Sequence, residues 1–153
     1  MNYTATMSTR VDPDWAELAD LVLIIAREIQ FRGYSDERAV PLSQSEGMVM
    51  RYLLSVPSAP PSQIAVATGL QRTNLSTVLR GLEAKDLIDR QANPEDGRGV
   101  TVRATEQGKR NYALVRGEWA TAVSAAAGAA APGLAAALSL LRAVESGLTS
   151  TRP

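Results

Sequence analysis

The segment from Pro61 to Lys85 constrains the fold more than any other part of the chain. Pro61 suits the first position of a helix, and the short helix expected from Ser62 to Thr68 is stopped by Gly69, which is free to take a positive φ. A longer helix is predicted from Thr73 to Lys85. A short helix, a tight turn holding Gly and then an amphipathic helix form the pattern of a helix-turn-helix motif.

The longer helix has a buried stripe and an outward face that differ in chemistry. The apolar residues recur at i, i+3, i+4 and i+7: Leu75, Val78, Leu79 and Leu82. The opposite face is polar and free of acidic side chains: Thr73, Ser76, Thr77, Arg80 and Ala84, flanked by Arg72 and Asn74. Such a helix can lie deep in the major groove of DNA, where Arg reads guanine and Asn reads adenine. A plain solvated face is the alternative, but such faces usually carry Glu and Lys, which occur here only near the helix end.

A β-hairpin is expected directly after this helix. The expected strands are Ile88 to Gln91 and Val100 to Thr105, joined by a turn-rich tip at residues 93–99. Arg98 stands between two glycines at the tip, a position suited to the negative potential of the minor groove. The alternative for Arg98 is an exposed charge without a role. Asp96 is expected to brace the tip by pairing with Arg90 or Arg98.

Charge is balanced over the chain but unevenly distributed along it. The 153 residues hold 16 basic and 16 acidic side chains, with nine basic against seven acidic within residues 43–110. Phosphate attraction must therefore come from a few placed Arg side chains, because a general basic field is absent. The sequence has no Cys and no His, which excludes disulfides, thiol switches and Cys/His metal sites. No catalytic constellation is recognisable either, so we expect neither an enzyme nor a cofactor nor a metal.

Further helices are expected on both sides of this module. A helical spacing of apolar residues begins near Asp12 and ends at Gly33, and another helix runs from Glu106 to about Ala126. The last helix carries a stripe that is too long for one small lobe to cover: Leu134, Leu138, Leu141, Val144 and Leu148. Pairing of two copies would bury this stripe, with ordinary core as the alternative. The polar N-terminus and the Pro132-Gly133 break in the Ala-rich run favour a cytoplasmic protein without a membrane partner.

The chain resembles the MarR-type winged-helix transcriptional regulators over about residues 12 to 148. The motifs that carry the resemblance are Leu42-Ser43-Gln44-Ser45-Glu46 with its capping box, Ile64-Ala65, Leu82-Glu83-Ala84-Lys85-Asp86-Leu87-Ile88-Asp89-Arg90, Pro94-Glu95-Asp96-Gly97-Arg98 and Thr105-Glu106-Gln107-Gly108. The resemblance implies a mainly α fold with a small β-hairpin wing, built as a single domain over residues 1–153. In that domain a winged helix-turn-helix lobe at 43–105 joins dimerisation helices at 12–32 and 106–148.

The resemblance also implies a homodimer that binds a pseudo-palindromic operator in double-stranded DNA. Many such proteins are repressors released by a small, often aromatic, ligand. The implied DNA contacts are Thr73, Asn74, Ser76, Thr77 and Arg80 in the major groove, Ser62, Gln63 and Arg72 at phosphates, and Arg98 in the minor groove. A ligand cleft would involve Trp15, Ile29, Tyr52 or Tyr112, although a core position explains each of them better. A winged-helix protein-interaction module without specific DNA binding is the alternative function.

Three positions depart from the family pattern. Asp86 stands where Gly is usual, so the end of the recognition helix must take a positive φ at some cost. Gly99 follows Arg98 where a second basic residue is common, which lowers the charge of the wing. Ala104 replaces the usual Leu before Thr105 and is expected to thin the packing beneath the wing.

Overall fold

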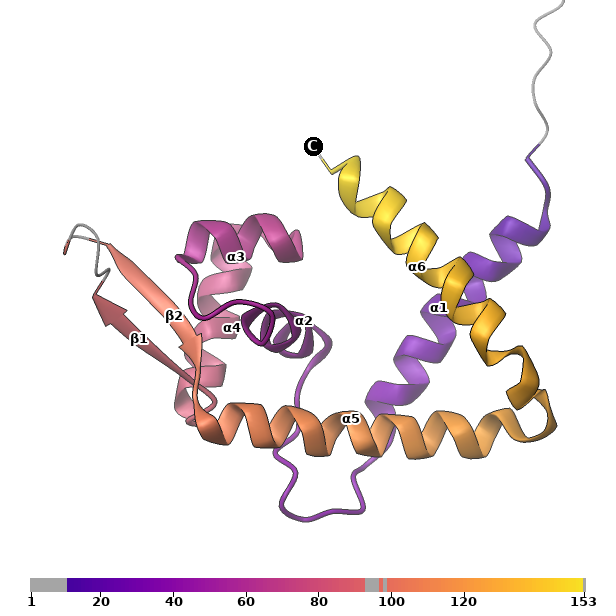
Figure 1. Ribbon diagram of the computed structural model, residues 1–153, viewed down its shortest axis with the longest axis horizontal. Coiled ribbons are helices and arrows are strands. Elements are labelled where there is room, and N and C mark those ends of the chain that lie inside the picture. The colour runs from indigo at the N-terminus through magenta and orange to yellow at the C-terminus, as the bar shows by residue number, and fades with distance from the viewer. Residues whose placement is uncertain (1–10, 93–96, 98, 153) are drawn as a thin grey trace, which may run out of the picture. The chain divides into compact units, whose positions relative to one another are not determined.

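The computed structural model describes residues 11–92, 97 and 99–152 (Figure 1). Contacts divide the chain into two units, one ending at Gly33 and the other beginning at Tyr34. The first unit consists of helix α1 (Asp14–Phe31), which begins where the Asp12 carboxylate accepts a hydrogen bond from the backbone N–H of Asp14 at 3.0 Å. All residues of α1 are described, and none of them is buried.

The second unit contains the helix-turn-helix motif, the hairpin and two further helices. In chain order its elements are α2 (Gln44–Leu53), α3 (Pro61–Thr68), α4 (Arg72–Ala84), β1 (Ile88–Ala92), β2 (Val100–Ala104), α5 (Glu106–Ala127), the 3₁₀ helix η1 (Gly128–Gly133) and α6 (Leu134–Ser150). The prediction of a mainly α fold with a β-hairpin wing is confirmed. We call residues 43–105, from the N-cap of α2 to the end of β2, the winged-helix lobe.

The helix boundaries in the lobe follow from local chemistry. Ser43 and Glu46 form the predicted capping box, with the Ser43 hydroxyl accepting from the Glu46 N–H at 3.2 Å and the Glu46 carboxylate accepting from the Ser43 N–H at 2.8 Å. Pro61 is the first residue of α3, and Gly69 ends that helix with φ 70°. Asp86 adopts the predicted positive φ, 57°, and thereby turns the chain from α4 into β1.

The two strands form an antiparallel hairpin that packs at its base against the helices of the lobe (Figure 1). In its register Ile88 lies opposite Ala104 and Ala92 lies opposite Val100. Val102 also pairs with Ala59, through backbone hydrogen bonds of 2.8 and 2.9 Å, so the segment before α3 adds a short third edge. Val100 and Val102 lie on the same face of β2, where Val102 is fully buried and Val100 is 44% exposed.

One apolar core holds the lobe together. Of the stripe predicted on α4, Leu75, Leu79 and Leu82 are each at most 2% exposed, and Val78 is half-buried against the same core. The side chains that share this core are Ala39, Leu42, Val49, Met50, Leu53, Ala59, Ile64, Leu75, Leu79, Leu82, Leu87, Ile88, Val102, Ala104, Tyr112 and Val115. The core therefore draws on α2, α3, α4, the hairpin and the first half of α5, which fixes how α4 is presented.

Polar contacts attach the connection that precedes α2 to α5. The buried Asn111 side chain accepts from the Val40 N–H at 2.7 Å and donates to the Val40 carbonyl at 3.0 Å. Glu118, one turn beyond the core, accepts from the backbone N–H of Ser35 at 2.8 Å and of Asp36 at 3.2 Å. The hydrogen bonds from Ser35 lower the pKa of the Glu118 carboxyl.

The helices at the end of the second unit are far more exposed than the lobe. The predicted helix break is confirmed at η1, which contains Pro132, although its side chains are exposed rather than close-packed within one chain. All residues of α6 are described, and none of them is buried. Within the described part of the chain, Glu106–Ser150 is long and apolar enough to cross a membrane by length and composition alone. Alanine supplies much of this apolar character, and the 3₁₀ helix η1 interrupts the run.

Candidate nucleic-acid interface

The outward side of α4 is the most distinctive polar surface of the lobe. Five of the predicted groove-contact residues are exposed on it, and we call them the α4 face: Thr73, Asn74, Ser76, Thr77 and Arg80. Arg80 donates a hydrogen bond to the Thr77 hydroxyl at 3.4 Å, and this hydroxyl donates to the Thr73 carbonyl at 3.4 Å. The face combines short hydroxyl and amide side chains with one guanidinium group and contains no carboxylate, a chemistry suited to the edges of base pairs.

An ion pair fixes the C-terminal end of α4 against the start of α2. Lys85 Nζ donates to both carboxylate oxygens of Glu46 at 2.7 and 2.8 Å and to the Pro41 carbonyl at 3.0 Å. The Glu46 side chain is only 10% exposed, so the pair is shielded from water. From the sequence, Glu46 was expected only to complete the capping box of α2. The capping carboxylate's second role is visible only once α4 is placed beside α2.

The predicted phosphate contacts lie around a pocket beside the α4 face. Ser62, Gln63 and Arg72 are exposed at the start of α3 and α4. Ser62 and Arg72 line a pocket of about 370 Å³, together with Ser76 of the α4 face and Arg90 of β1. The fold thus brings together polar side chains from three elements that are up to 28 positions apart in the sequence.

The hairpin carries two ion pairs on opposite faces. Arg90 Nε contacts Glu83 Oε2 at 3.2 Å, whereas Arg103 contacts both oxygens of Asp89 at 2.8 and 2.9 Å. The Arg103 guanidinium lowers the pKa of the Asp89 carboxyl through these hydrogen bonds. Two further predicted residues, Asp96 and Arg98, lie outside the described residues, so the minor-groove contact and the bracing by Asp96 stay predictions.

The tentative ligand residues are divided between the two units. Tyr112 belongs to the core, as the alternative reading held, and packs edge to face against Trp119 with ring centroids 6.4 Å apart. Burial raises the pKa of Tyr112. Tyr52 is half-buried on α2. Trp15 is 51% exposed on α1, so a core position within its own unit is wrong for it, and Ile29 on the same helix is half-buried.

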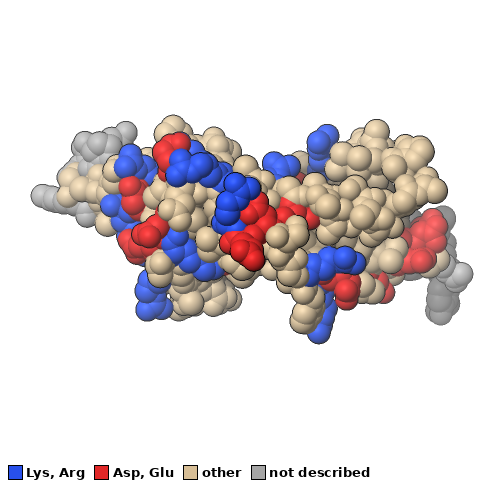
Figure 2. Space-filling model, turned by 90° about the horizontal axis from the view of Figure 1, so that it is seen from below, with Lys and Arg blue, Asp and Glu red and all other residues tan. Residues whose placement is uncertain are grey.

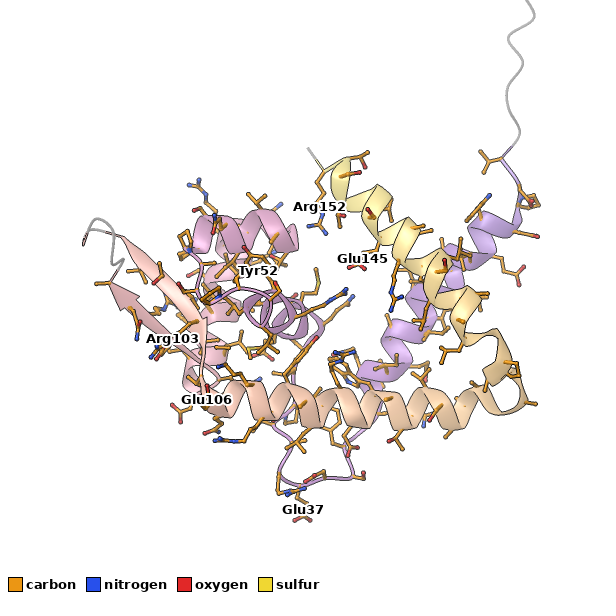
Figure 3. The ribbon with its side chains drawn as sticks, in the orientation of Figure 1. Glu37, Tyr52, Arg103, Glu106, Glu145 and Arg152 are labelled. Atoms are coloured by element: carbon orange, nitrogen blue, oxygen red, sulfur yellow. The ribbon has the colours of Figure 1, made fainter. Side chains whose placement is uncertain are left out.

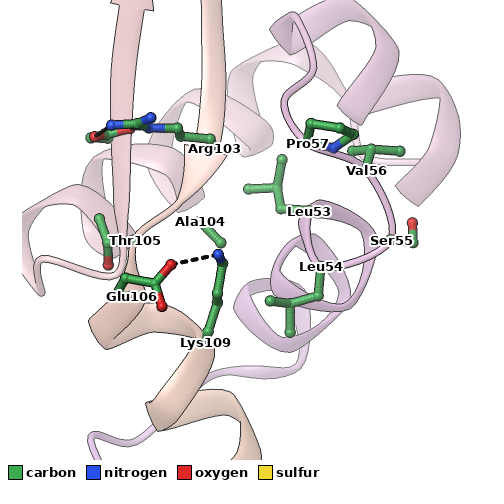
Figure 4. A pocket seen from close by; sticks show the side chains of 11 residues that line it. Leu53, Leu54, Ser55, Val56, Pro57, Arg103, Ala104, Thr105, Glu106 and Lys109 are labelled. Carbon is green, nitrogen blue, oxygen red and sulfur yellow. Dashed lines mark hydrogen bonds and ion pairs between the residues drawn. The ribbon is translucent and has the colours of Figure 1, made fainter.

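Two further pockets border the lobe. One of about 310 Å³ lies between α2, α3 and α6, where Arg51 pairs with Glu145 at 3.1 Å and Arg152 donates to the Ala67 carbonyl at 3.0 Å (Figure 3). The other, of about 740 Å³, lies between the end of α2, the base of the hairpin and the start of α5 (Figure 4). Ala104 lines this second pocket, which is where its small side chain was expected to thin the packing.

Several charges elsewhere on the second unit are paired with charges of opposite sign. Arg103 and Lys109 at the larger pocket are both paired with carboxylates, those of Asp89 and Glu106. On the face drawn in Figure 2, Lys and Arg side chains lie among Asp and Glu side chains. Among the described residues, no group of three or more acidic side chains could hold a metal ion. The α4 face and the pocket beside it therefore form the best-defined candidate site.

Comparisons with known proteins agree with this architecture. The model of the MarR family matches residues 41–99, which span nearly all of the winged-helix lobe. No curated protein matches the chain. Among solved structures, the transcriptional regulator SlyA is similar with a TM-score of 0.69 and 18% identity, over 88% of this chain and 95% of that chain.

The names of two other similar structures include small aromatic molecules. NadR in complex with 4-hydroxyphenylacetate has a TM-score of 0.64 and 17% identity, over 99% of this chain and 100% of that chain. BpsR of Bordetella bronchiseptica, whose DNA binding is regulated by 6-hydroxynicotinic acid, has a TM-score of 0.63 and 18% identity, over 84% of this chain and 98% of that chain. At these identities the likeness establishes the fold. Residues 41–99 therefore match the MarR family, and over the rest of the chain the likeness to these solved structures is one of winged-helix fold.

Proposed function

We propose that this protein is a sequence-specific double-stranded DNA-binding transcriptional regulator. The observation that carries the proposal is the α4 face, an exposed and acid-free surface on the second helix of a helix-turn-helix motif. An α-helix fits the major groove, where each base pair presents a distinct pattern of donors and acceptors. Members of the MarR family are transcription regulators rather than enzymes, which supports this class of function.

In the proposed complex each element has a separate task. The α4 face reads base edges, with Arg80 directed to guanine and Asn74 to adenine. Ser62, Gln63 and Arg72 contact phosphates, and these contacts set the register of the protein on the duplex without reading sequence. Arg98 at the wing tip enters the minor groove. The central segment carries only a small excess of basic residues, so placement of these side chains has to supply the affinity.

We further propose that two copies bind one pseudo-palindromic operator. The support is the exposed apolar surface of α1 and α6, where large side chains such as Leu23, Phe31 and Leu148 are about 70% exposed in the single chain. Soluble proteins rarely leave so much apolar surface in water, and two-fold assembly is the commonest way to cover it. A symmetric dimer would present two α4 faces to half-sites one helical turn apart.

A small aromatic molecule is the proposed effector, and repression in the cytoplasm is the proposed mode of action. The support is the shared fold with NadR bound to 4-hydroxyphenylacetate and with BpsR, which responds to 6-hydroxynicotinic acid. Trp15, Ile29, Tyr52 and Tyr112 are the proposed contacts, and they supply aromatic and aliphatic surface with two phenolic groups. The missing Cys excludes thiol oxidation as the signal in this chain.

The experiment that tests the main proposal compares Arg80→Ala with Arg38→Ala on DNA fragments that flank the coding region. Both residues are exposed Arg side chains, but Arg38 is paired with Asp36 at 2.8 Å in the connection before α2. Arg80→Ala should lower affinity for one fragment by about tenfold or more and relax its base preference, since a good bidentate contact contributes about 1–3 kcal/mol. Arg38→Ala should bind like the unmodified protein.

The alternative is a winged-helix module that binds another protein. The near-neutral charge of the segment 43–110 favours it, because non-specific DNA binding depends on basic side chains. Equal, weak binding of every fragment by all three proteins would contradict the DNA proposal and favour this alternative.

A further inference from the structure

The pocket beside the α4 face is lined by hydrogen-bond donors above an apolar floor. Its polar lining comes from Ser62 of α3, Arg72 and Ser76 of α4, and Arg90 of β1, over an apolar floor of Leu75 and Leu79. Both leucines are 2% exposed, so the floor belongs to the core and is fixed in place. The described residues that line the pocket include two guanidinium groups and two hydroxyls but no carboxylate. This is a donor-rich concavity of about 370 Å³.

The two Arg side chains suit an anion with several acceptor oxygens. A guanidinium group presents its N–H donors in a planar fork that matches phosphate oxygens, and hydroxyl groups can add single hydrogen bonds. Ser76 belongs to the α4 face and Ser62 lies in the first turn of α3, so the pocket is continuous with the surface proposed to meet DNA. A phosphodiester beside a helix in the major groove would therefore lie within reach of these groups.

The Arg90 ion pair differs from the ion pair on the other face of the hairpin. Arg90 meets Glu83 through one contact of 3.2 Å, and the two side chains are 34% and 44% exposed. Arg103 meets Asp89 through two parallel hydrogen bonds of 2.8 and 2.9 Å. The Arg103 and Asp89 side chains are about as exposed, at 47% and 41%, so the difference between the pairs lies in their geometry. One longer contact holds a guanidinium group less firmly than two short parallel hydrogen bonds do. Arg90 can therefore exchange its carboxylate partner for another anion more readily than Arg103 can.

We propose that this pocket binds one phosphodiester of the DNA backbone, with Arg72 and Arg90 as its principal ligands and Glu83 as a carboxylate that competes for Arg90. The inference rests on the proposed function as a DNA-binding protein. It gives Arg90 a second role besides the bracing expected from the sequence. It also couples the base of the wing to the α4 face, because one phosphate would bind residues of both β1 and α4.

Arg90→Gln and Arg103→Gln form a matched pair for the test. Both remove one positive charge and one ion pair from the same hairpin, but adjacent positions of a strand point to opposite faces, and Asp89, the partner of Arg103, is adjacent to Arg90. Fluorescence anisotropy measures the Kd for an operator fragment and for a duplex of unrelated sequence at several salt concentrations. Arg90→Gln should raise both Kd values by about tenfold and reduce the salt slope by about one, the expected effect of one lost phosphate contact. Arg103→Gln should stay within about twofold of the unmodified protein.

Glu83→Gln and Asp89→Asn test the competing carboxylate. Glu83→Gln frees Arg90 from its partner and should tighten binding of both duplexes by about twofold to fivefold, since a surface ion pair contributes little to begin with. Asp89→Asn should leave binding unchanged. Thermal unfolding of each variant reports whether the fold is retained. If Arg90→Gln is unfolded, Arg90→Lys replaces it, and the lost fork should weaken binding while the salt slope is kept.

The outcomes separate this inference from the proposed function. If the unmodified protein selects an operator but Arg90→Gln and Arg103→Gln bind alike, the phosphate pocket is contradicted and the DNA function stands. An Arg90→Gln variant that loses affinity only for the operator would mean base reading and would also contradict the pocket. The last experiment titrates inorganic phosphate into the protein without DNA. If phosphate binds in an Arg90-dependent way while Arg90→Gln leaves DNA binding unaffected, the pocket binds free phosphate and the phosphodiester proposal is contradicted. If no operator is selected at all, both proposals fail.

Discussion

The winged-helix lobe buries its large apolar side chains, whereas the terminal helices α1 and α6 leave theirs exposed in the single chain. In the lobe, Val49, Ile64, Leu82 and Val102 are wholly buried. Hydrogen bonds from Lys85 to the Pro41 carbonyl and between Asn111 and Val40 attach the segment before α2 to the end of α4 and to α5. Helices α1 and α6 are also rich in apolar residues, yet among these fully described helices none is buried. The lobe therefore has the features of a self-contained folding unit.

The terminal helices α1 and α6 do not bury their apolar faces within the single chain. A helix with a wide apolar face is stable in water only when another surface covers it. The stability of the two regions should therefore depend on different conditions. We expect stability of the lobe to depend on its own packing, and we expect order in the terminal helices to depend on protein concentration through assembly.

The largest expected effect is on assembly. Leu141, 39% exposed on α6, lies on the stripe proposed to be covered by a second copy. Leu141→Asp would place an unpaired carboxylate in that interface, which costs about 3–5 kcal/mol and raises the dimer dissociation constant by about 100-fold or more. Sedimentation equilibrium measures this constant. Ser139→Asp, on the other side of the same helix, is the control and should leave it unchanged. Equal dissociation constants for the two variants would place the interface elsewhere.

The next largest expected effect is on the stability of the lobe. Leu82 is 0% exposed in the core, whereas Leu148 is 69% exposed on α6. Leu82→Ala should lower the free energy of unfolding by about 2–5 kcal/mol through lost contacts and a residual cavity. Leu148→Ala should change it by less than about 0.5 kcal/mol at concentrations where the chain is monomeric. Urea denaturation followed by circular dichroism compares them, and similar losses for both would remove the distinction between the regions.

A third comparison uses two glycines of the same helix. A Cβ at Gly108, at the lobe end of α5, would overlap the Leu87 carbonyl, whereas nothing lies within 4 Å of a Cβ at Gly117. Gly108→Ala should cost about 1–3 kcal/mol of unfolding free energy, because backbone must shift. Gly117→Ala should instead stabilise the helix by up to about 1 kcal/mol. Thermal unfolding of the two variants should thus move in opposite directions, and a stabilising Gly108→Ala would refute the close packing of α5 on the lobe.

The smallest effect concerns the connection held by Glu118. Its pKa is lowered by the Ser35 hydrogen bonds from the ordinary value of 4.5, so its contribution to stability is complete above that value and is lost as the pH falls through the lower, folded-state pKa. Glu118→Gln should therefore flatten the decline of stability just below that ordinary value. Asp36, whose pKa is lowered to about 2 by Arg38, loses its contribution at lower pH still. Unfolding midpoints measured from neutral pH down to about pH 2 test whether Glu118 loses its contribution before Asp36 does. The same decline in Glu118→Gln as in the unmodified protein would contradict this account.

The sequence predicted those parts of the fold that depend on local signals. The capping box at Ser43, the positive φ at Gly69 and Asp86, and the buried stripe of α4 each follow from one residue or one period, and each is confirmed. Contacts between distant segments were not predictable in this way. The Lys85 to Glu46 ion pair and the pocket that contains Arg90 depend on tertiary placement, which no spacing along the chain encodes.

At the candidate site, the sequence predicted which side chains of α4 are exposed, and their role in binding DNA stays a prediction. Helical periodicity placed the five residues of the α4 face on one exposed surface, because the period of a helix is fixed. Periodicity could not assign Arg90 to a pocket with Arg72, since the two residues come from different elements. Their proximity depends on the turn at Asp86 and on the register of the hairpin.

The central claim is that paired α4 faces read DNA, and footprinting on the DNA that flanks the coding region tests it most directly. The account predicts two protected half-sites with centres about one helical turn apart, and loss of this protection with Arg80→Ala at the same protein concentration. Protection that is absent, or that is the same on competitor DNA and unaffected by Arg80→Ala, would contradict the claim.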